Sequence, residues 1–263
     1  MDNNNYIYGK NAVAEALEAG KPIEKILVCF GNQAVGGMSR IYKLAKDAGV
    51  ACVSYDKRKF MALEKELCGK GSEGNDTNAL KTQGVIAMVR TFDILEVDAV
   101  ISILGEEVNP VIVVLDEIAD PHNLGAIARS AECAGAGGLI ITERNSAPLS
   151  PAAVKASAGA LEHIPVAKVG NLATTLEKLK AAGYWIVGTD GAGDRDYTDD
   201  IYDRPIALVI GSEGKGMRPL IEKHCDYLVR IPMRGKINSL NASVSAGVVL
   251  FEMLRQKMAR SKA

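Results

Sequence analysis

Apolar and polar positions alternate with two different periods along the first ninety residues. Segments with helical spacing are followed by short β-prone runs, and Gly20 and Gly49 mark the ends of the first two helices. The pattern predicts helices over residues 11–19, 39–49 and 59–67 and strands over residues 25–30, 50–55 and 84–89. Because helices and strands alternate, we expect residues 1–90 to form a small α/β domain.

The same alternation continues from residue 109 to the end of the chain. Val111–Leu115 is a run of five β-prone apolar residues, which is typical of a strand buried on both faces of a parallel sheet. Further strands are predicted over residues 138–142, 184–190, 205–211 and 227–233, and helices over residues 123–135, 150–162, 171–183 and 240–259. We therefore expect residues 109–263 to form a parallel sheet with helices on both faces, and ligands to bind at the carboxyl ends of its strands. Residues 91–108 lack strong turn signals and are interpreted as a linker.

The composition is that of an ordinary globular protein. Hydrophobic residues make up 48% of the 263 residues, charged residues make up 24%, and the net charge is −1. The apolar run Val244–Leu250 is too short to span a membrane, and the first ten residues show no signal-peptide pattern, so we expect a cytoplasmic protein without a membrane partner. Residues 1–90 carry a net charge of +3 and the remainder carries −4. The positive half, with "DKRKF" at 56–60, suits either a polyanionic partner or an ordinary solvated surface.

Cysteines and histidines give no sign of a metal centre or a disulfide framework. The five cysteines are odd in number and contain no CxxC pair, and the three histidines lie far apart in the chain. We expect reduced, buried thiols and no metal.

A glycine-rich loop follows the strand predicted at 205–211. The stretch "LVIGSEGKGM", residues 208–217, is not a Walker A loop because Lys215 is followed by glycine rather than Ser or Thr. A second loop, "GTDGAG" at 188–193, also follows a strand, but Asp190 and Asp194 would repel a pyrophosphate. Both loops are better suited to backbone contact with an uncharged, flat ligand such as adenosine, or are simply turns.

Two further stretches carry polar residues at helix starts. In "DEIADPHNLGAIARSAECAG", residues 116–135, Asn123 is a good helix N-cap, and Arg129 would need an anion or a solvated face. In "IPMRGKINSLNASVSAG", residues 231–247, the basic Arg234 and Lys236 precede Ser239 and Asn241, which are suitable caps for the last helix.

The order of these stretches carries a family resemblance that none of them carries alone. An N-x5-R helix start, a strand followed by G-x-E-G-x-G, and I-P-M followed by S-L-N resemble the SpoU (TrmH) family of RNA ribose 2′-O-methyltransferases over residues 109–263. The first ninety residues, with "YGKNAVAEALEAG" and "KTQGVIAMV", look like the ribosomal-protein-like RNA-binding domain of the subgroup that acts on guanosine in 23S ribosomal RNA. Family members often have His-Gln-Gly where this chain has Thr82-Gln83-Gly84.

The resemblance implies a fold, a cofactor and partners that the residue pattern alone does not indicate. It implies a SPOUT-type parallel sheet with a C-terminal trefoil knot, S-adenosylmethionine held by the knot loops, a structured RNA substrate and a homodimer formed through the knotted domain. The positions that match the family's cofactor contacts are Thr189, Gly191, Gly211, Ile231, Met233, Ser239 and Leu240. The positions that match its catalytic set are Asn123, Arg129, Glu213, Ser239 and Asn241.

Three other functions stay in consideration beside methyl transfer to 23S ribosomal RNA. A ribose methyltransferase acting on tRNA shares the same motifs. An RNA-binding module without catalysis would not need all five polar positions. A nicotinamide-dependent oxidoreductase would need G-x-G-x-x-G after the first strand of the second domain, and "DEIADPHNLG" lacks it.

Overall fold

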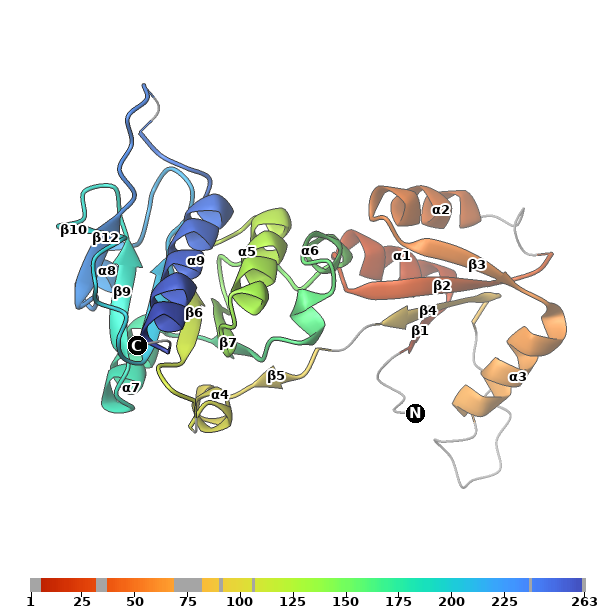
Figure 1. Ribbon diagram of the computed structural model, residues 1–263. Coiled ribbons are helices and arrows are strands. Elements are labelled where there is room, and N and C mark those ends of the chain that lie inside the picture. Colours follow the sequence, from red (N-terminus) through yellow and green to blue (C-terminus); the bar gives the residue numbers. More distant parts are fainter. Residues whose placement is uncertain are drawn as a thin grey trace. The chain divides into compact units, whose positions relative to one another are not determined.

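The computed structural model describes residues 6–31, 37–68, 82–89, 92–105, 107–236 and 238–261. The chain divides into two compact units with separate hydrophobic cores (Figure 1). The first unit comprises Met1–Phe92 with Pro148–Ala152, and the second comprises Asp93–Ala147 with Ala153–Ala263. The segment 93–108, interpreted as part of a linker, therefore belongs to the second unit.

The first unit is a sheet with helices on both faces. Its described strands are β1 (Tyr6–Tyr8), β2 (Ile23–Cys29), β3 (Ala51–Tyr55) and β4 (Val85–Val89), and its helices are α1 (Lys10–Glu18), α2 (Met38–Asp47) and α3 (Lys57–Cys68). The strands lie in the order β1-β4-β2-β3; β2 and β3 are parallel, and β4 is antiparallel to both of its neighbours. Because side chains alternate along a strand, Ile26 and Val28 pack in one core with α1 and α2, whereas Leu27 packs in the other with Phe60 of α3.

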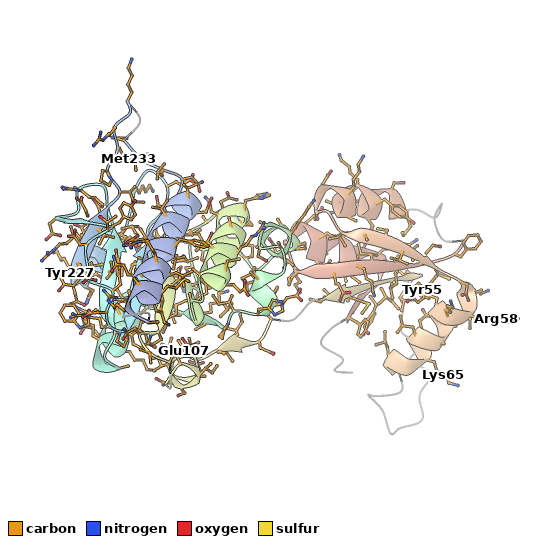
Figure 2. The ribbon with its side chains drawn as sticks, in the orientation of Figure 1. Tyr55, Arg58, Lys65, Glu107, Tyr227 and Met233 are labelled. Atoms are coloured by element: carbon orange, nitrogen blue, oxygen red, sulfur yellow. The ribbon has the colours of Figure 1, made fainter. Side chains whose placement is uncertain are left out.

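The positive stretch at 56–60 begins helix α3. Asp56 accepts a hydrogen bond from the backbone N–H of Lys59 at 2.9 Å, so it fixes the first turn of the helix. Arg58 and Lys65 are exposed and extend from the surface of the first unit (Figure 2). The local positive charge predicted for this unit is thus available to solvent.

The Thr82-Gln83 pair lies at the start of β4 and is held by both of its side chains. The Thr82 hydroxyl is 2% exposed, bonds the carboxylate of Glu64 and accepts from the Gly84 N–H at 3.2 Å. Gln83 accepts from the Lys10 backbone N–H at 3.0 Å. Thr82 therefore ties β4 to α3 and has a structural role in the first unit.

The second unit is an α/β fold with a parallel sheet, as predicted. Its described strands are β5 (Ile94–Leu95), β6 (Val111–Leu115), β7 (Gly138–Thr142), β8 (Val166–Val169), β9 (Trp185–Thr189), β10 (Arg195–Asp196), β11 (Ile206–Ile210) and β12 (Tyr227–Arg230). Its described α-helices are α4 (Val97–Ile103), α5 (Pro121–Cys133), α7 (Leu172–Ala181), α8 (Pro219–Glu222), α9 (Ala242–Arg260) and α6 (Pro151–Ala156), of which the first two residues are counted in the first unit. The strands lie in the order β10-β12-β9-β11-β6-β7-β8-β5, and every described pair is parallel.

Helices cover both faces of this sheet. Ile112 and Val114 of β6 pack in a core with residues of α4, α7 and α8. Val113 and Leu115 alternate with them and are also fully buried, on the opposite face. There α5 and α9 lie side by side (Figure 1). The two-sided burial explains why β6, β7 and β11 read as continuous apolar runs.

The pattern missed the short elements. β5 and β10 have two residues each, and β8 has four with an exposed Lys168. Such lengths are too short for a period to emerge, and pairing with β8 rather than local propensity holds β5 in place.

One predicted helix cap is wrong and one is confirmed. The N-cap of α5 is Asp120, whose carboxylate accepts from the His122 N–H at 3.0 Å, because Pro121 takes the first helical position. Asn123 therefore lies inside the first turn, and its side chain is free for another role. Asn241 is the N-cap of α9 and accepts from the N–H groups of Ser243 and Val244.

The described residues contain no helix long and apolar enough to cross a membrane and no cluster of three metal-ligating side chains. Cys29, Cys52, Cys133 and Cys225 are free thiols. Burial raises the pKa of the Cys225 thiol to about 12, so this thiol stays protonated. Cys133 is exposed, which corrects the expectation that all the thiols are buried.

Two glycines inside helices should respond in opposite ways to substitution by alanine. A Cβ on Gly125 of α5 would lie 2.3 Å from the Ala153 carbonyl oxygen, whereas a Cβ on Gly247 of α9 would meet only Ser130 Oγ at 3.5 Å. We expect Gly125→Ala to destabilise the second unit by about 1–3 kcal/mol through overpacking. Gly247→Ala, the matched control, should stabilise it by up to about 1 kcal/mol because alanine favours helix.

Urea unfolding followed by Trp185 fluorescence tests this pair, because Trp185 is the only tryptophan of the chain and lies on β9. Equal effects of the two substitutions would contradict the packing described for α5.

Candidate cofactor pocket and polar network

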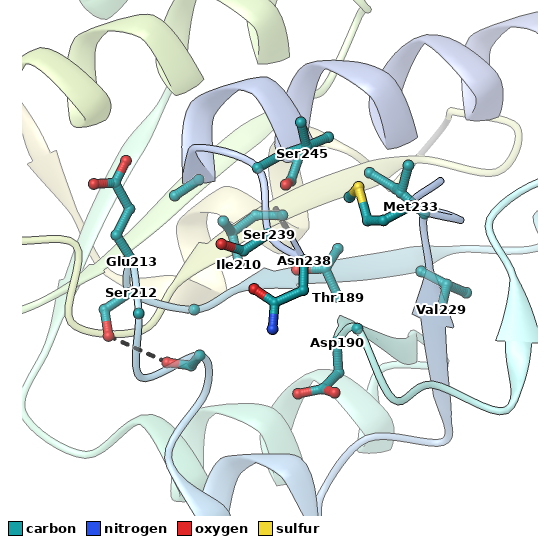
Figure 3. Close-up of a pocket in the computed structure, with 17 residues that line it drawn as sticks. Thr189, Asp190, Ile210, Ser212, Glu213, Val229, Met233, Asn238, Ser239 and Ser245 are labelled. Carbon is teal, nitrogen blue, oxygen red and sulfur yellow. Dashed lines mark hydrogen bonds between the residues drawn. The ribbon is translucent and has the colours of Figure 1, made fainter. Parts of the chain in front are cut away.

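A pocket of about 370 Å³ opens at the carboxyl ends of three neighbouring strands (Figure 3). Thr189 ends β9, Gly211 follows β11, and Ile231 follows β12. Strands β12, β9 and β11 are consecutive in the sheet, so the loops that leave them meet at one edge. This is the place where parallel α/β sheets bind ligands.

Every position predicted from the family's cofactor contacts lines this pocket. The residues are Thr189, Gly191, Gly211, Ile231, Met233, Ser239 and Leu240. They come from three stretches of sequence, at 189–191, at 211 and at 231–240, and the fold brings these stretches together.

The pocket also contains side chains that the sequence did not single out as ligand contacts. Asp190, Ser212, Asn238 and Ser245 line it (Figure 3). Asp190 was interpreted only as a group that repels pyrophosphate; its carboxylate accepts from the Ala192 N–H at 2.7 Å and holds the turn that follows β9. Two carboxylates, Asp190 and Glu213, therefore line a pocket that the glycine loops make accessible.

Gly211 is required by the close folding of the loop that it begins. A Cβ at this position would lie 2.3 Å from both the carbonyl carbon of Gly216 and the nitrogen of Met217. The loop closes through hydrogen bonds between Ser212 and Gly216, including the Ser212 Oγ contact to the Gly216 carbonyl at 3.2 Å (Figure 3). The glycine thus serves close backbone packing, with no phosphate needed to explain it.

A polar network joins the three motifs. Asn123 Nδ2 donates to Glu213 Oε1 at 3.2 Å, and Asn241 Nδ2 donates to Asn123 Oδ1 at 3.0 Å. Asn241 Nδ2 also bonds the same Glu213 oxygen. Asn123 is 8% exposed, and the network connects the start of α5, the loop after β11 and the start of α9.

An ion pair between a buried carboxylate and an exposed arginine fixes the loop that carries Glu213. The Asp116 side chain is fully buried at the end of β6 and accepts from Arg218 Nε at 2.7 Å, Arg218 NH2 at 2.7 Å and the Arg218 backbone N–H at 2.8 Å. Met217, the residue before, is buried beside Gly188 of β9. The loop is thus anchored immediately after its last glycine, and Asp116 and Arg218 are positioning residues that the sequence did not indicate.

Arg129 stands apart from this network. It is exposed on α5 and makes no hydrogen bond or ion pair with any residue in the described ranges. It lies six residues beyond Asn123, about 9 Å along the helix. Within one copy of the chain, Asn123, Glu213, Ser239 and Asn241 converge on the pocket or its network, and Arg129 does not line the pocket.

A parallel α/β fold with a ligand pocket at the carboxyl ends of its strands defines the class of this unit. A model described as the SpoU rRNA Methylase family matches residues 110–251, and one described as RNA 2′-O ribose methyltransferase substrate binding matches residues 6–66. The chain belongs to the SpoU rRNA methylase family of RNA methyltransferases.

Relatives cover both units. The chain is 41% identical over 254 residues to YacO of Bacillus subtilis, which is named as a TrmH family tRNA/rRNA methyltransferase, with 96% of each chain covered. The SpoU methyltransferase AviRb from Streptomyces viridochromogenes, solved in complex with the cofactor AdoMet, is 27% identical with a TM-score of 0.61, over 97% of this chain and 90% of that one. The A. aeolicus TrmH/SpoU tRNA modifying enzyme is 28% identical with a TM-score of 0.54, over 63% of this chain and 84% of that one.

The Asp116–Arg218 pair predicts a large loss of stability on substitution. Asp116→Asn keeps the shape of the side chain but removes the buried charge that three N–H groups satisfy, so we expect the second unit to lose about 1–3 kcal/mol of unfolding free energy. Asp98→Asn is the matched control, because Asp98 pairs with Lys178 at 2.6 Å but its side chain is 70% exposed. That variant should lose less than about 1 kcal/mol.

Urea unfolding curves followed by Trp185 fluorescence measure both variants. If the two variants lost similar amounts of unfolding free energy, the Asp116–Arg218 ion pair would not anchor the loop.

Proposed function

We propose that this protein transfers a methyl group from S-adenosylmethionine to the 2′-hydroxyl of a ribose in ribosomal RNA, with a guanosine of 23S ribosomal RNA as the expected target. The observation that carries the proposal is the convergence of three motif stretches on one pocket, joined by the Asn123–Glu213–Asn241 network. A ribosomal RNA substrate would place the reaction in the cytoplasm. A tRNA substrate is the second candidate, because one relative at this fold is a tRNA modifying enzyme.

The pocket has the size and chemistry for S-adenosylmethionine. Its volume lies within the range of about 300–1,000 Å³ typical of small-molecule sites. Ile210, Val229 and Leu240 offer apolar surface for a nucleoside, and the Thr189 and Ser239 hydroxyls offer polar contacts. The cofactor carries positive charge at its sulfonium and ammonium groups, and the Asp190 and Glu213 carboxylates complement such charge, whereas they would oppose a phosphate.

The residues of this chain then have defined tasks in the reaction. S-adenosylmethionine supplies an activated methyl group when bound, so the chain must hold the ribose oxygen in line and stabilise its negative charge as its proton leaves. We assign that stabilisation to Arg129, because a cationic guanidinium is better suited to an anionic oxygen or phosphate than to accepting a proton. Asn123, Glu213 and Asn241 order the site, and Ser239 shapes the pocket.

We propose a homodimer through the surface that carries Arg129. Val244, Phe251 and Met258 repeat every seven residues along α9 and are 49%, 49% and 52% exposed. A seven-residue apolar repeat on a helix is typical of a helix–helix contact. Since α5 packs against α9, a partner copy placed there would meet the exposed face of Arg129 and could bring this side chain to a pocket. The trefoil knot belongs to the same proposal and rests on the family resemblance.

Arg129→Ala should strongly reduce methyl transfer without weakening the binding of the cofactor. Loss of one group that stabilises a developing anion lowers kcat by about 10²–10³-fold, and Arg129 does not line the pocket. Tritiated methyl transfer to 23S ribosomal RNA and to tRNA, with mapping of the modified ribose, gives the rate and the target, and calorimetry gives the cofactor Kd. Arg195→Ala, at an exposed arginine of β10, is the control and should leave the rate unchanged.

Wild-type turnover by Arg129→Ala would remove Arg129 from the mechanism, and modification of tRNA alone would favour the second candidate.

Deletion of residues 1–92 should separate the two units by function. The first unit has its own cores, and the pocket residues all belong to the second unit. We expect the truncated chain to bind S-adenosylmethionine with a Kd within twofold of the full chain and to lose its preference for one RNA over another. The ratio of methyl transfer to ribosomal RNA and to tRNA measures that preference; an unchanged ratio would contradict an RNA-recognition role for the first unit.

A further inference from the structure

Three basic side chains lie at the rim of the pocket, on the two loops that flank it. Lys215 lies between Gly214 and Gly216, which line the pocket. Arg234 and Lys236 lie in the segment between Met233 and Asn238, which also line it. Figure 2 shows Met233 where this segment leaves the body of the second unit. All three basic residues are exposed.

These rim cations have no acidic partner among the residues that the structure describes. None of the three forms an ion pair or a hydrogen bond with another residue in the described part of the chain. Most arginines of the second unit do have one: Arg204, Arg218, Arg230, Arg255 and Arg260 each contact a carboxylate. The charge at the rim is therefore available to a ligand from outside.

The signs of charge differ between the inside of the pocket and its rim. Asp190 and Glu213 are among the residues that line the pocket and suit a cationic ligand, whereas Lys215, Arg234 and Lys236 are not, so the positive rim serves something else. Residues 91–263 carry a net charge of −4, which means that the second unit as a whole does not attract a polyanion. Any attraction of RNA to the pocket mouth must then come from local cations.

We propose that Lys215, Arg234 and Lys236 hold the sugar-phosphate backbone of a single-stranded RNA segment at the pocket mouth. This assignment rests on the proposed function and adds to it the residues that present the ribose to the pocket. An arginine and two lysines on exposed loops provide sequence-independent phosphate contacts, so they position the strand and leave recognition of the sequence to other residues. An unstacked strand is also the form of RNA in which a single ribose is accessible.

The contribution of such contacts can be measured from the salt dependence of RNA binding. Each phosphate contact on a single strand adds about −0.7 to the slope of log K against log salt, so Arg234→Gln with Lys236→Gln should make the slope shallower by about 1.4. The loss of affinity should then be about sevenfold greater at 50 mM salt than at 200 mM. Lys215→Gln alone should change the slope by about 0.7.

The full-length chain is titrated with a fluorescent 15-nucleotide oligouridylate between 50 and 200 mM salt, and S-adenosylmethionine binding is measured by calorimetry. The matched control is Arg204→Gln with Lys223→Gln, one arginine and one lysine that precede β11 and β12 and so lie at the amino ends of these strands. The expected result is a shallower slope for the rim variant alone, with its cofactor Kd within twofold of wild type.

An equal slope in the rim variant and the control would overturn the proposal, as would a rim variant whose cofactor affinity falls in step with its RNA affinity. Oligouridylate binding does not depend on turnover, so it separates this proposal from the proposed function. If the wild-type chain transfers no methyl group to any RNA but the rim variant still changes the slope, the proposed reaction fails and the RNA-binding rim stands.

Discussion

The candidate site depends on the Glu213 carboxylate, which accepts hydrogen bonds from the side-chain amides of both Asn123 and Asn241. Asn123 and Glu213 are 90 positions apart in sequence, and Asn123 and Asn241 are 118 apart. Both amides donate to the same carboxylate oxygen, Glu213 Oε1, at the point where α5 and α9 begin. The same contact sets the starts of these two helices relative to the loop that bounds the pocket.

That contact works only because the loop itself is held. Gly211 allows the chain to fold against Gly216, and Met217 is buried beside Gly188. The Asp116 carboxylate accepts hydrogen bonds from Arg218. Between these anchors only a few residues remain, so Glu213 has little freedom to move away from its partners. Stability and site geometry thus share one element. The Asp116 carboxylate that anchors this loop is buried, whereas Glu213, Lys215 and Arg218 of the loop are exposed.

Much of this arrangement can be predicted from the sequence, and the exceptions have physical reasons. The runs at 112–115, 138–142 and 206–210 are buried throughout and their apolar composition indicates parallel strands, whereas β5 and β8 are too short for any pattern. Asn123 was expected to cap α5, but Pro121 moves the cap to Asp120 and leaves Asn123 to bond Glu213. The cofactor positions came from a family resemblance, and they meet at one pocket. Asp116 and Arg218 escaped notice because an ion pair between residues 102 positions apart leaves no local signal.

The most direct test of the central claim is a double-mutant cycle between Asn123 and Glu213, read in kcat/KM for methyl transfer to the RNA that the wild-type protein modifies. Residues that act through one shared contact are strongly non-additive. The account predicts that Asn123→Ala and Glu213→Ala together reduce kcat/KM by at least about tenfold less than the product of their separate reductions, a coupling of about 1.4 kcal/mol or more. Separate effects that simply multiply would contradict it, because the two side chains would then contribute to the site independently.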